Sequence, residues 1–108
     1  MSAKKGDCFQ VAGHLMYDRP NAMLVHALIT PHLGPLAGKT FVHAWVEDGG
    51  TAYDYSNGHR HEVDAEVYRA LAQPDNVRTY SEIEMRKMIL RHKHWGPWDK
   101  SFYRENAR

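Results

Sequence analysis

The sequence predicts a single α+β domain, in which a mainly antiparallel sheet packs against an N-terminal helix that carries the only cysteine, Cys8. Residues 39–57 have the composition of a β-hairpin, with β-branched and aromatic residues on both sides of an Asp-Gly-Gly turn. Residues 81–84, Ser-Glu-Ile-Glu, form a capping box that opens a helix. A chain of 108 residues is long enough for one hydrophobic core and too short for two.

The first helix is expected over residues 8–17, with Asp7 as its N-cap and apolar side chains at helical spacing. Asp-Arg-Pro-Asn at residues 18–21 ends it, because proline cannot continue a helix. Cys8 then lies in the first turn, where free backbone N–H groups and the positive end of the helix dipole stabilise a thiolate. The alternative is that Cys8 is a small, buried hydrophobic residue.

Four strands are expected, at residues 22–29, 41–46, 51–55 and 77–80. The first strand is apolar at nearly every position except His26, which is typical of a strand covered on both faces. We therefore expect His26 to be structural. Residues 30–38 contain two prolines and two glycines, so they are expected to form a loop, placed to make one wall of a cleft.

Two further helices are expected, at residues 64–71 and 82–92. Asp64 is the N-cap of the former, and its core face is predicted to consist of Val67, Ala70 and Leu71. The latter carries an apolar stripe made of Ile83, Met85, Met88, Ile89 and Leu90. Residues 92–98 contain two tryptophans and are expected to pack back on the domain, whereas residues 101–108 look polar and frayed.

The hairpin predicts the most informative contact in the chain. If Asp48-Gly49 is a two-residue turn, His43 lies directly opposite Asp54. Directly opposed side chains have Cβ atoms roughly 4.5–5.5 Å apart, close enough for a carboxylate to hold an imidazole. A three-residue loop would shift the pairing by one and separate the two on opposite faces. Cysteine, strand histidine and strand aspartate, in that order, suggest a thiol nucleophile with an oriented base.

Composition disfavours several other classes of function. Fourteen Lys and Arg against thirteen Asp and Glu give a formal charge of +1, which favours neither nucleic acid nor a membrane surface as a partner. No apolar run approaches the roughly 20 residues needed to span a bilayer. A lone cysteine forms no internal disulfide, and the N-terminus has no apolar signal core, so a cytoplasmic location is expected.

Histidine pairs offer a metal-binding alternative. They are His59 with His61 and His92 with His94. Zinc sites need three or four suitable ligands, and a solvated polar loop over residues 59–62 is the favoured interpretation. We therefore expect no metal and no cofactor.

Three segments resemble one family when taken in order. GDCFQ at a helix start, HAWVE on a strand and YDYSN on the next are similar to the papain-like and transglutaminase-like fold, including small NlpC-like bacterial and phage proteins. The resemblance implies a papain-like architecture with Cys8, His43 and Asp54 as a catalytic triad. It also implies a cysteine-dependent acyl hydrolase or transferase acting on a peptide or amide through a thioester.

Two further residues are candidates for substrate binding. Papain-like enzymes usually place a glutamine upstream of the cysteine to stabilise the oxyanion, whereas here Gln10 follows it. Trp45 shares a strand face with His43, so it is predicted either to line the acyl pocket or to pack in the core. The competing function is a non-catalytic binding module of the same fold, such as a phage or mobile-element protein acting on a host component. Peptidase, amidase, deamidase and transferase activities all stay open, as does the oligomeric state.

Overall fold

A computed structural model of the protein describes residues 7–106. Its helices are α1 (Cys8–Tyr17), α2 (Ala65–Ala72), α3 (Glu82–His92) and α4 (Lys100–Asn106), with a 3-10 turn η1 (Ser56–Gly58). Its strands are β1 (Met23–Ile29), β2 (Phe41–Asp48), β3 (Thr51–Asp54), β4 (His61–Asp64) and β5 (Asp75–Tyr80). Over these residues the chain forms one five-stranded sheet in the order β4-β3-β2-β1-β5, with every neighbouring pair antiparallel. The predicted α+β class and antiparallel sheet are confirmed.

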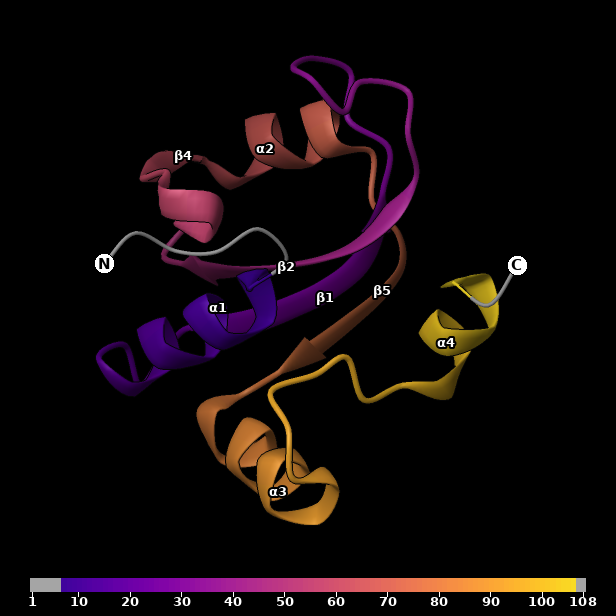
Figure 1. Cartoon of the computed structure of the whole chain (residues 1–108). Helices are drawn as coiled ribbons and strands as arrows, with labels where there is room; N and C mark the ends of the chain where they lie inside the picture. The colour runs from indigo at the N-terminus through magenta and orange to yellow at the C-terminus, as the bar shows by residue number, and fades with distance from the viewer. Residues whose placement is uncertain (1–6, 107–108) are drawn as a thin grey trace.

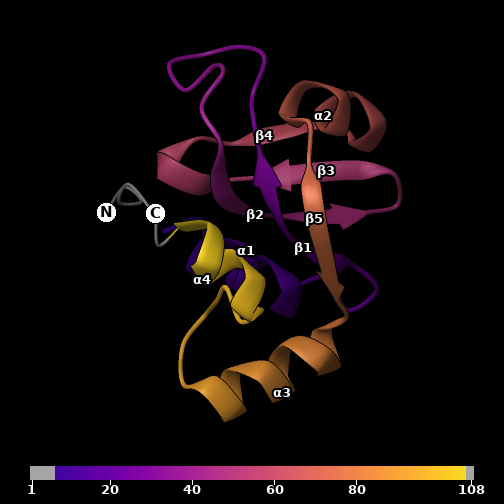
Figure 2. The same cartoon turned by 90° about the vertical axis from the view of Figure 1, so that its right-hand side faces the viewer.

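The sheet lies between two helical layers, with α2 on one side and α1 and α3 on the other (Figures 1 and 2). Side chains along β1 point alternately to the two faces of the sheet, and they pack into two separate hydrophobic clusters. Leu24 packs with Met16 of α1 and Met85 of α3, whereas Val25 and its like-facing neighbours pack toward α2. This explains why β1 is apolar along nearly its whole length, since both of its faces are covered.

The central hairpin turns one residue later than predicted. Asp48 pairs with Thr51, so the turn consists of Gly49 and Gly50, whose φ angles are 58° and 84°. Two-residue turns with positive φ at both central positions match the twist of a hairpin, and two glycines adopt them without steric cost. Asp48 remains in the strand, where its carboxylate pairs with Arg19 at 3.2 Å. The predicted Asp48-Gly49 turn is therefore wrong, and each partner is displaced by two residues.

Two elements occur where irregular structure was expected. A polar loop was predicted over residues 59–62, but His61–Asp64 form β4, which pairs with β3 along the edge of the sheet and is exposed throughout. A polar edge strand has no apolar alternation to reveal it, and such a strand also protects a sheet edge from association. Residues 100–106 form α4, anchored by the fully buried Phe102, so the frayed end predicted there is wrong. Residues 107–108 lie outside the described residues.

Neither of the two later helices buries the apolar face predicted for it: α2 buries a different face, with the predicted core residue Ala70 exposed, and α3 buries a narrower one. In α2, Val67 is 52% and Leu71 42% exposed, while Tyr68 and Ala72 pack on the core. The ring of Tyr68 lies 5.0 Å from that of Trp45, so the aromatic contact determines which face α2 buries. In α3 the predicted capping box and bounds are present, but only Met85, Met88 and Ile89 of the stripe reach the core. The exposed members of that stripe are Ile83 and Leu90.

The segment after α3 packs back on the domain, as predicted, and it lies on the α1 side of the sheet. Trp98 is 4% exposed and belongs to the core shared with α1. Its ring centroid lies 4.9 Å from that of His26, which is fully buried and also contacts Phe9 at 4.9 Å and Tyr80 at 5.1 Å. Neither ring nitrogen of His26 has a hydrogen-bond partner among residues 7–106. His26 is therefore a buried structural residue enclosed by aromatic side chains.

None of the helices within residues 7–106 combines the length and the apolar character that crossing a membrane requires.

Candidate active site

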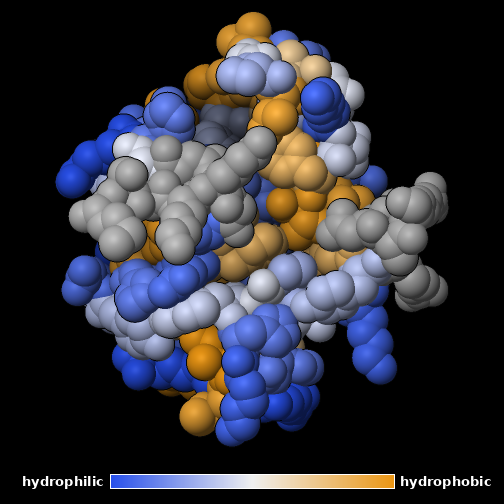
Figure 3. All heavy atoms as spheres, in the orientation of Figure 1, coloured by the Kyte–Doolittle hydropathy of each residue, from blue (hydrophilic) through white to orange (hydrophobic). Residues whose placement is uncertain are grey.

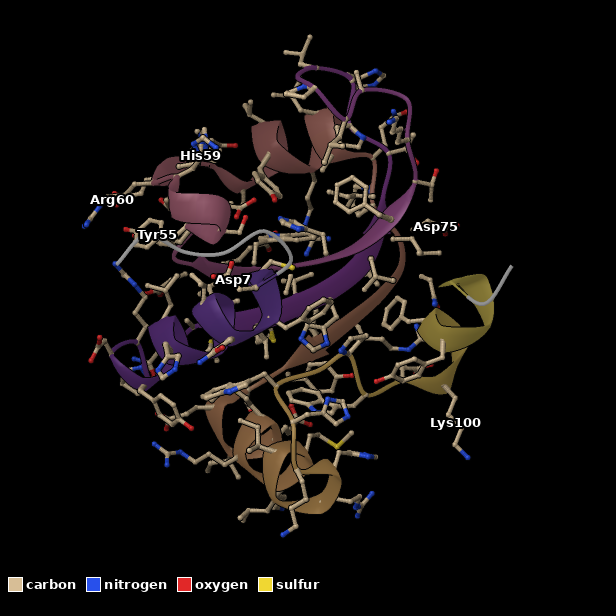
Figure 4. All side chains as sticks on the ribbon, in the orientation of Figure 1. Asp7, Tyr55, His59, Arg60, Asp75 and Lys100 are labelled. Carbon is tan, nitrogen blue, oxygen red and sulfur yellow. The ribbon has the colours of Figure 1, made fainter. Side chains whose placement is uncertain are left out.

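Cys8 is the first residue of α1, and the residue as a whole is 7% exposed. The carbonyl of Asp7 accepts the Val11 N–H at 3.1 Å, so α1 begins at this position. In Figure 4, Asp7 marks the start of α1 near the middle of the molecule, between Tyr55 on one side and Asp75 on the other. The thiol is therefore held at a helix N-terminus that abuts β2, the strand carrying His43.

His43 and Asp54 form the hydrogen bond that sequence reasoning predicted, although by a different register. The observed pairing displaces Asp54 by two residues from the position directly opposite His43. Because the displacement is an even number, both side chains stay on the same face and meet diagonally. Nε2 of His43 lies 2.8 Å from Oδ2 of Asp54, and the two side chains are 10% and 15% exposed.

The Asp54 carboxylate accepts hydrogen bonds on both oxygens. Ser56 donates to Oδ1 through its hydroxyl at 2.7 Å and its backbone N–H at 3.2 Å. The Tyr68 hydroxyl donates to Oδ2 at 2.7 Å, beside the bond from His43. Burial alone would raise the pKa of Asp54, but the hydrogen bond and charge of His43, together with the bonds from Ser56 and Tyr68, hold that pKa well below its usual range. Asp54 is therefore an anion with a fixed orientation.

The electrostatics favour a protonated His43. Burial lowers its pKa, but hydrogen bonds to Asp54 and Cys8, together with the charges of both groups, outweigh burial and raise the pKa to about 10. Since Nε2 is bonded to Asp54, Nδ1 is the ring nitrogen left for Cys8. The imidazole is thus bonded to the carboxylate of β3, and the nearby thiol of α1 adds to the rise of its pKa.

A layer of side chains beneath His43 fixes its position. Trp45 is fully buried, and its ring lies 6.3 Å from that of His43 in a stacked arrangement. Its indole N–H donates to Glu47 at 2.9 Å, and Arg69 of α2 binds the same carboxylate through two hydrogen bonds of 2.8 and 3.1 Å. Trp45 has no exposed surface, so the acyl-pocket role proposed for it does not fit this structure, and the core alternative does.

Phe41 is a residue that sequence reasoning missed. It is half-buried on the same strand face as His43, and the two rings meet edge to face at 5.9 Å. The signal was the i, i+2 alternation of Phe41, His43 and Trp45 on one strand. Gln10 is exposed on α1 two residues after Cys8, and its role as an oxyanion donor stays a prediction.

Tyr68 and Ser56 were also missed. Ser56 is 7% exposed, and the signal for it was a small hydroxyl residue two positions after Asp54, a spacing typical of turns in which an aspartate accepts local hydrogen bonds. Tyr68 comes from a helix far along the chain, so sequence separation gives no clue to its contact with Asp54.

The face of the molecule seen in Figure 3 is partly apolar. Figure 3 shows apolar residues extending from the top of the molecule toward its centre, with polar residues on both sides. A shallow cavity of about 270 Å³ lies along α1, lined by Val11, His14, Leu15, Asp18 and Tyr55. Its lining includes none of Cys8, His43 and Asp54, so it is separate from the candidate site.

Metal coordination finds little support at the histidine pairs. The rings of His59 and His61 lie 5.3 Å apart, and those of His92 and His94 lie 6.0 Å apart. Within residues 7–106 no three His, Cys, Asp or Glu side chains are grouped so that they could hold a metal ion.

Comparison of the chain with protein-family models, with curated proteins and with solved structures found no match.

Proposed function

We propose that this protein is a cysteine-dependent acyl hydrolase or transferase acting on an amide, with a papain-like architecture and a Cys8-His43-Asp54 triad. The observation that supports the proposal is the placement of His43, which is hydrogen-bonded to Asp54 at 2.8 Å through Nε2 and lies near enough to Cys8 for the thiol to help raise the pKa of the imidazole. A cysteine nucleophile needs a base within hydrogen-bond reach and a third group that orients the base. Asp54 is placed to orient His43, and Cys8, at the start of α1, is the nucleophile that we propose for this base.

In the first half of the reaction the Cys8 thiolate attacks the carbonyl carbon of the amide. A C–S bond forms, and the carbonyl π electrons move to oxygen to give a tetrahedral oxyanion. When the oxyanion collapses, the C–N bond breaks and the leaving amine takes a proton from the His43 imidazolium. The products of this half are a Cys8 thioester, a free amine and a neutral imidazole.

The second half regenerates the enzyme. His43 accepts a proton from water, or from an acceptor amine, as that nucleophile attacks the thioester carbonyl. The C–S bond breaks and releases the acid or the transferred amide, which restores the thiolate and imidazolium. Asp54 stays ionised throughout and stabilises the charged ring.

Stabilisation of the oxyanion requires hydrogen-bond donors near Cys8. The Cys8 backbone N–H lies at the first residue of α1, where helix geometry supplies no intrahelical acceptor. Gln10 is the proposed second donor. Phe41, half-buried beside His43, gives the site an apolar edge and favours an acyl group with a hydrophobic substituent.

The test is the pH dependence of Cys8 alkylation by iodoacetamide, located by mass spectrometry. Because a free thiol has a pKa of about 8.5, a thiolate paired with His43 should alkylate at pH 6 at least about tenfold faster than in His43→Ala. Removing the imidazole opens access to Cys8, so a steric effect would act in the opposite direction. His32→Ala, which changes an exposed loop histidine, is the matched control and should behave as the wild type.

A second measurement tests acyl transfer itself. With p-nitrophenyl acetate the expected result is release of nitrophenolate and a hydroxylamine-sensitive acetyl group on Cys8, both lost in Cys8→Ala. The competing function, a binding module, is favoured by the low exposure of Cys8 and His43, 7% and 8%. Equal alkylation in wild type and His43→Ala, with the pH profile of a free thiol, would reject catalysis in favour of that module.

A further inference from the structure

The Tyr68 hydroxyl and the His43 ring share one oxygen of Asp54. Both bonds end on Oδ2, at 2.7 and 2.8 Å, while Ser56 occupies Oδ1. A carboxylate bonded at one oxygen alone is free to rotate about its Cβ–Cγ bond, which is a soft, two-fold torsion. Donors on both oxygens remove that freedom. His43 on Oδ2 and Ser56 on Oδ1 already limit this rotation, and Tyr68 adds a second donor to Oδ2 from another element of the fold. The direction in which the carboxylate meets His43 therefore depends on two groups outside the triad.

The position of Tyr68 is itself determined by its neighbours. Its ring packs 5.0 Å from that of Trp45, beneath the His43 ring. Arg69, the next residue on α2, binds Glu47 of β2 through two hydrogen bonds. Consecutive residues of one helix turn thus connect to carboxylates on two adjacent strands. This arrangement fixes the distance between α2 and the sheet, and it sets the phenol at hydrogen-bond range from Asp54.

The Tyr68 hydroxyl is the donor, and Asp54 the acceptor, of the hydrogen bond between them. Burial and the negative charge of Asp54 raise the pKa of Tyr68 well above its usual range, so its proton stays on the hydroxyl. A hydroxyl at 2.7 Å from an anion makes a charge-assisted bond, which is stronger and more directional than a neutral one.

We propose that Tyr68 is a positioning residue of the active site, which holds Oδ2 of Asp54 in the orientation that keeps the His43 imidazolium paired with Cys8. This rests on the proposed function, since it concerns the same triad. Two opposite effects are conceivable when the hydroxyl is removed, and they differ in sign. Loss of positioning weakens the hold of Asp54 on the imidazolium, whereas loss of a competing donor alone strengthens it, because more of the carboxylate charge is then available to His43.

Tyr68→Phe tests this with the pH profile of Cys8 alkylation. The ring and its packing are kept, and only the hydroxyl is lost. We expect the profile to move to higher pH by about half a unit or more, because a weakened imidazolium stabilises the thiolate less. Tyr55→Phe is the matched control, since it removes a phenol that donates to another carboxylate, Glu62, on the exposed edge of the sheet. That variant should keep the wild-type profile.

Asp54→Ala provides the decisive background. If Tyr68 acts through Asp54, Tyr68→Phe has no further effect on the profile once the carboxylate is gone. Ser56→Ala, which removes the hydroxyl donor to Oδ1, should move the profile in the same direction, and it serves as the independent variant if Tyr68→Phe does not fold. A profile that stays unchanged or moves to lower pH in Tyr68→Phe overturns the inference. A wild-type profile that already matches a free thiol overturns the proposed function instead, so the two failures are distinguishable.

Discussion

His26 should make the protein sensitive to acid, and His26→Leu should remove that sensitivity. The imidazole is fully buried, and both nitrogens lack a hydrogen-bond partner within residues 7–106. Burial lowers its pKa from 6.5 to about 3. Below pH 6.5 the unfolded chain therefore binds a proton that the folded chain does not, so the free energy of unfolding falls as the pH falls, until the folded His26 also protonates near pH 3.

The magnitude follows from the width of this interval. Each pH unit between the two pKa values is worth about 1.4 kcal/mol, so two units, from pH 6.5 to 4.5, lower the free energy of unfolding by about 2–3 kcal/mol. Groups near the His26 ring do not titrate between pH 6.5 and 4.5, so they add nothing to this change in the free energy of unfolding. Phe9 and Trp98 carry no titratable proton, the pKa of Tyr80 is raised by burial, and hydrogen bonds from Ser101 and Arg78 lower the pKa of Asp99 to about 2.

The assay is urea unfolding of wild type and variants at pH 7 and pH 4.5, followed by circular dichroism. The quantity compared is the loss of unfolding free energy between the two pH values. Between these two pH values we expect the free energy of unfolding to fall by about 2–3 kcal/mol more in wild type than in His26→Leu. This difference does not depend on how much the substitution destabilises the protein at pH 7. His32→Gln, which replaces an exposed histidine, should lose as much as the wild type. An equal loss in wild type and His26→Leu would refute a neutral, unpartnered His26.

Two further predictions concern other parts of the chain. A Cβ on Gly13 would lie 2.5 Å from a ring carbon of Trp95, so Gly13→Ala should destabilise the protein by about 1–3 kcal/mol. In a Trp95→Ala background the same change should stabilise α1 by up to about 1 kcal/mol, and urea unfolding that shows no reversal of sign would reject the clash. Because the pKa of His43 is about 10, the folded chain keeps a proton that the unfolded chain loses above pH 6.5. The proposed Cys8 thiolate offsets that proton until the unfolded thiol ionises near its free pKa of about 8.5, so the free energy of unfolding should fall only above about pH 8.5, by no more than about 1.4 kcal/mol per unit. The fall should be steeper in wild type than in His43→Gln, and matching slopes would contradict a protonated His43.

The helix bounds and the His43-Asp54 contact were predictable because each depends on local rules. The bounds of α1 and α3 follow from residues near their ends, including the capping box of Ser81 and Glu84. The prediction of the His43-Asp54 contact held although the predicted turn was wrong. A change of register by an even number of residues leaves both side chains on the same face of the sheet. Composition alone does not choose between Asp48-Gly49 and Gly49-Gly50 as the turn. The ion pair of Asp48 with Arg19 is a tertiary contact, invisible in the hairpin sequence.

The face of α2 and the role of Tyr68 were not predictable in the same way. In an eight-residue helix, the stripe of Val67 and Leu71 and the stripe of Tyr68 and Ala72 are offset by one residue, and hydrophobicity favours the former. The structure buries the latter because Tyr68 meets Trp45 and Asp54, which lie on strands far away in sequence. Polar groups that find partners across the fold leave no periodic signature in the sequence. β4 was missed for a different reason, since it is exposed throughout and has no apolar alternation.

The sheet order has a consequence for synthesis of the chain. β1, the most apolar strand, pairs on one side with β2 and on the other with β5, which is made much later. Until residues 75–80 leave the ribosome, the nascent domain presents β1 as an open edge, with unpaired amides along an apolar segment. Such an edge is a template for aggregation, and long-range pairing of this kind forms slowly. A chain truncated before β5 should therefore aggregate. During synthesis, a chaperone that shields residues 23–29 would be needed most before β5 has been made.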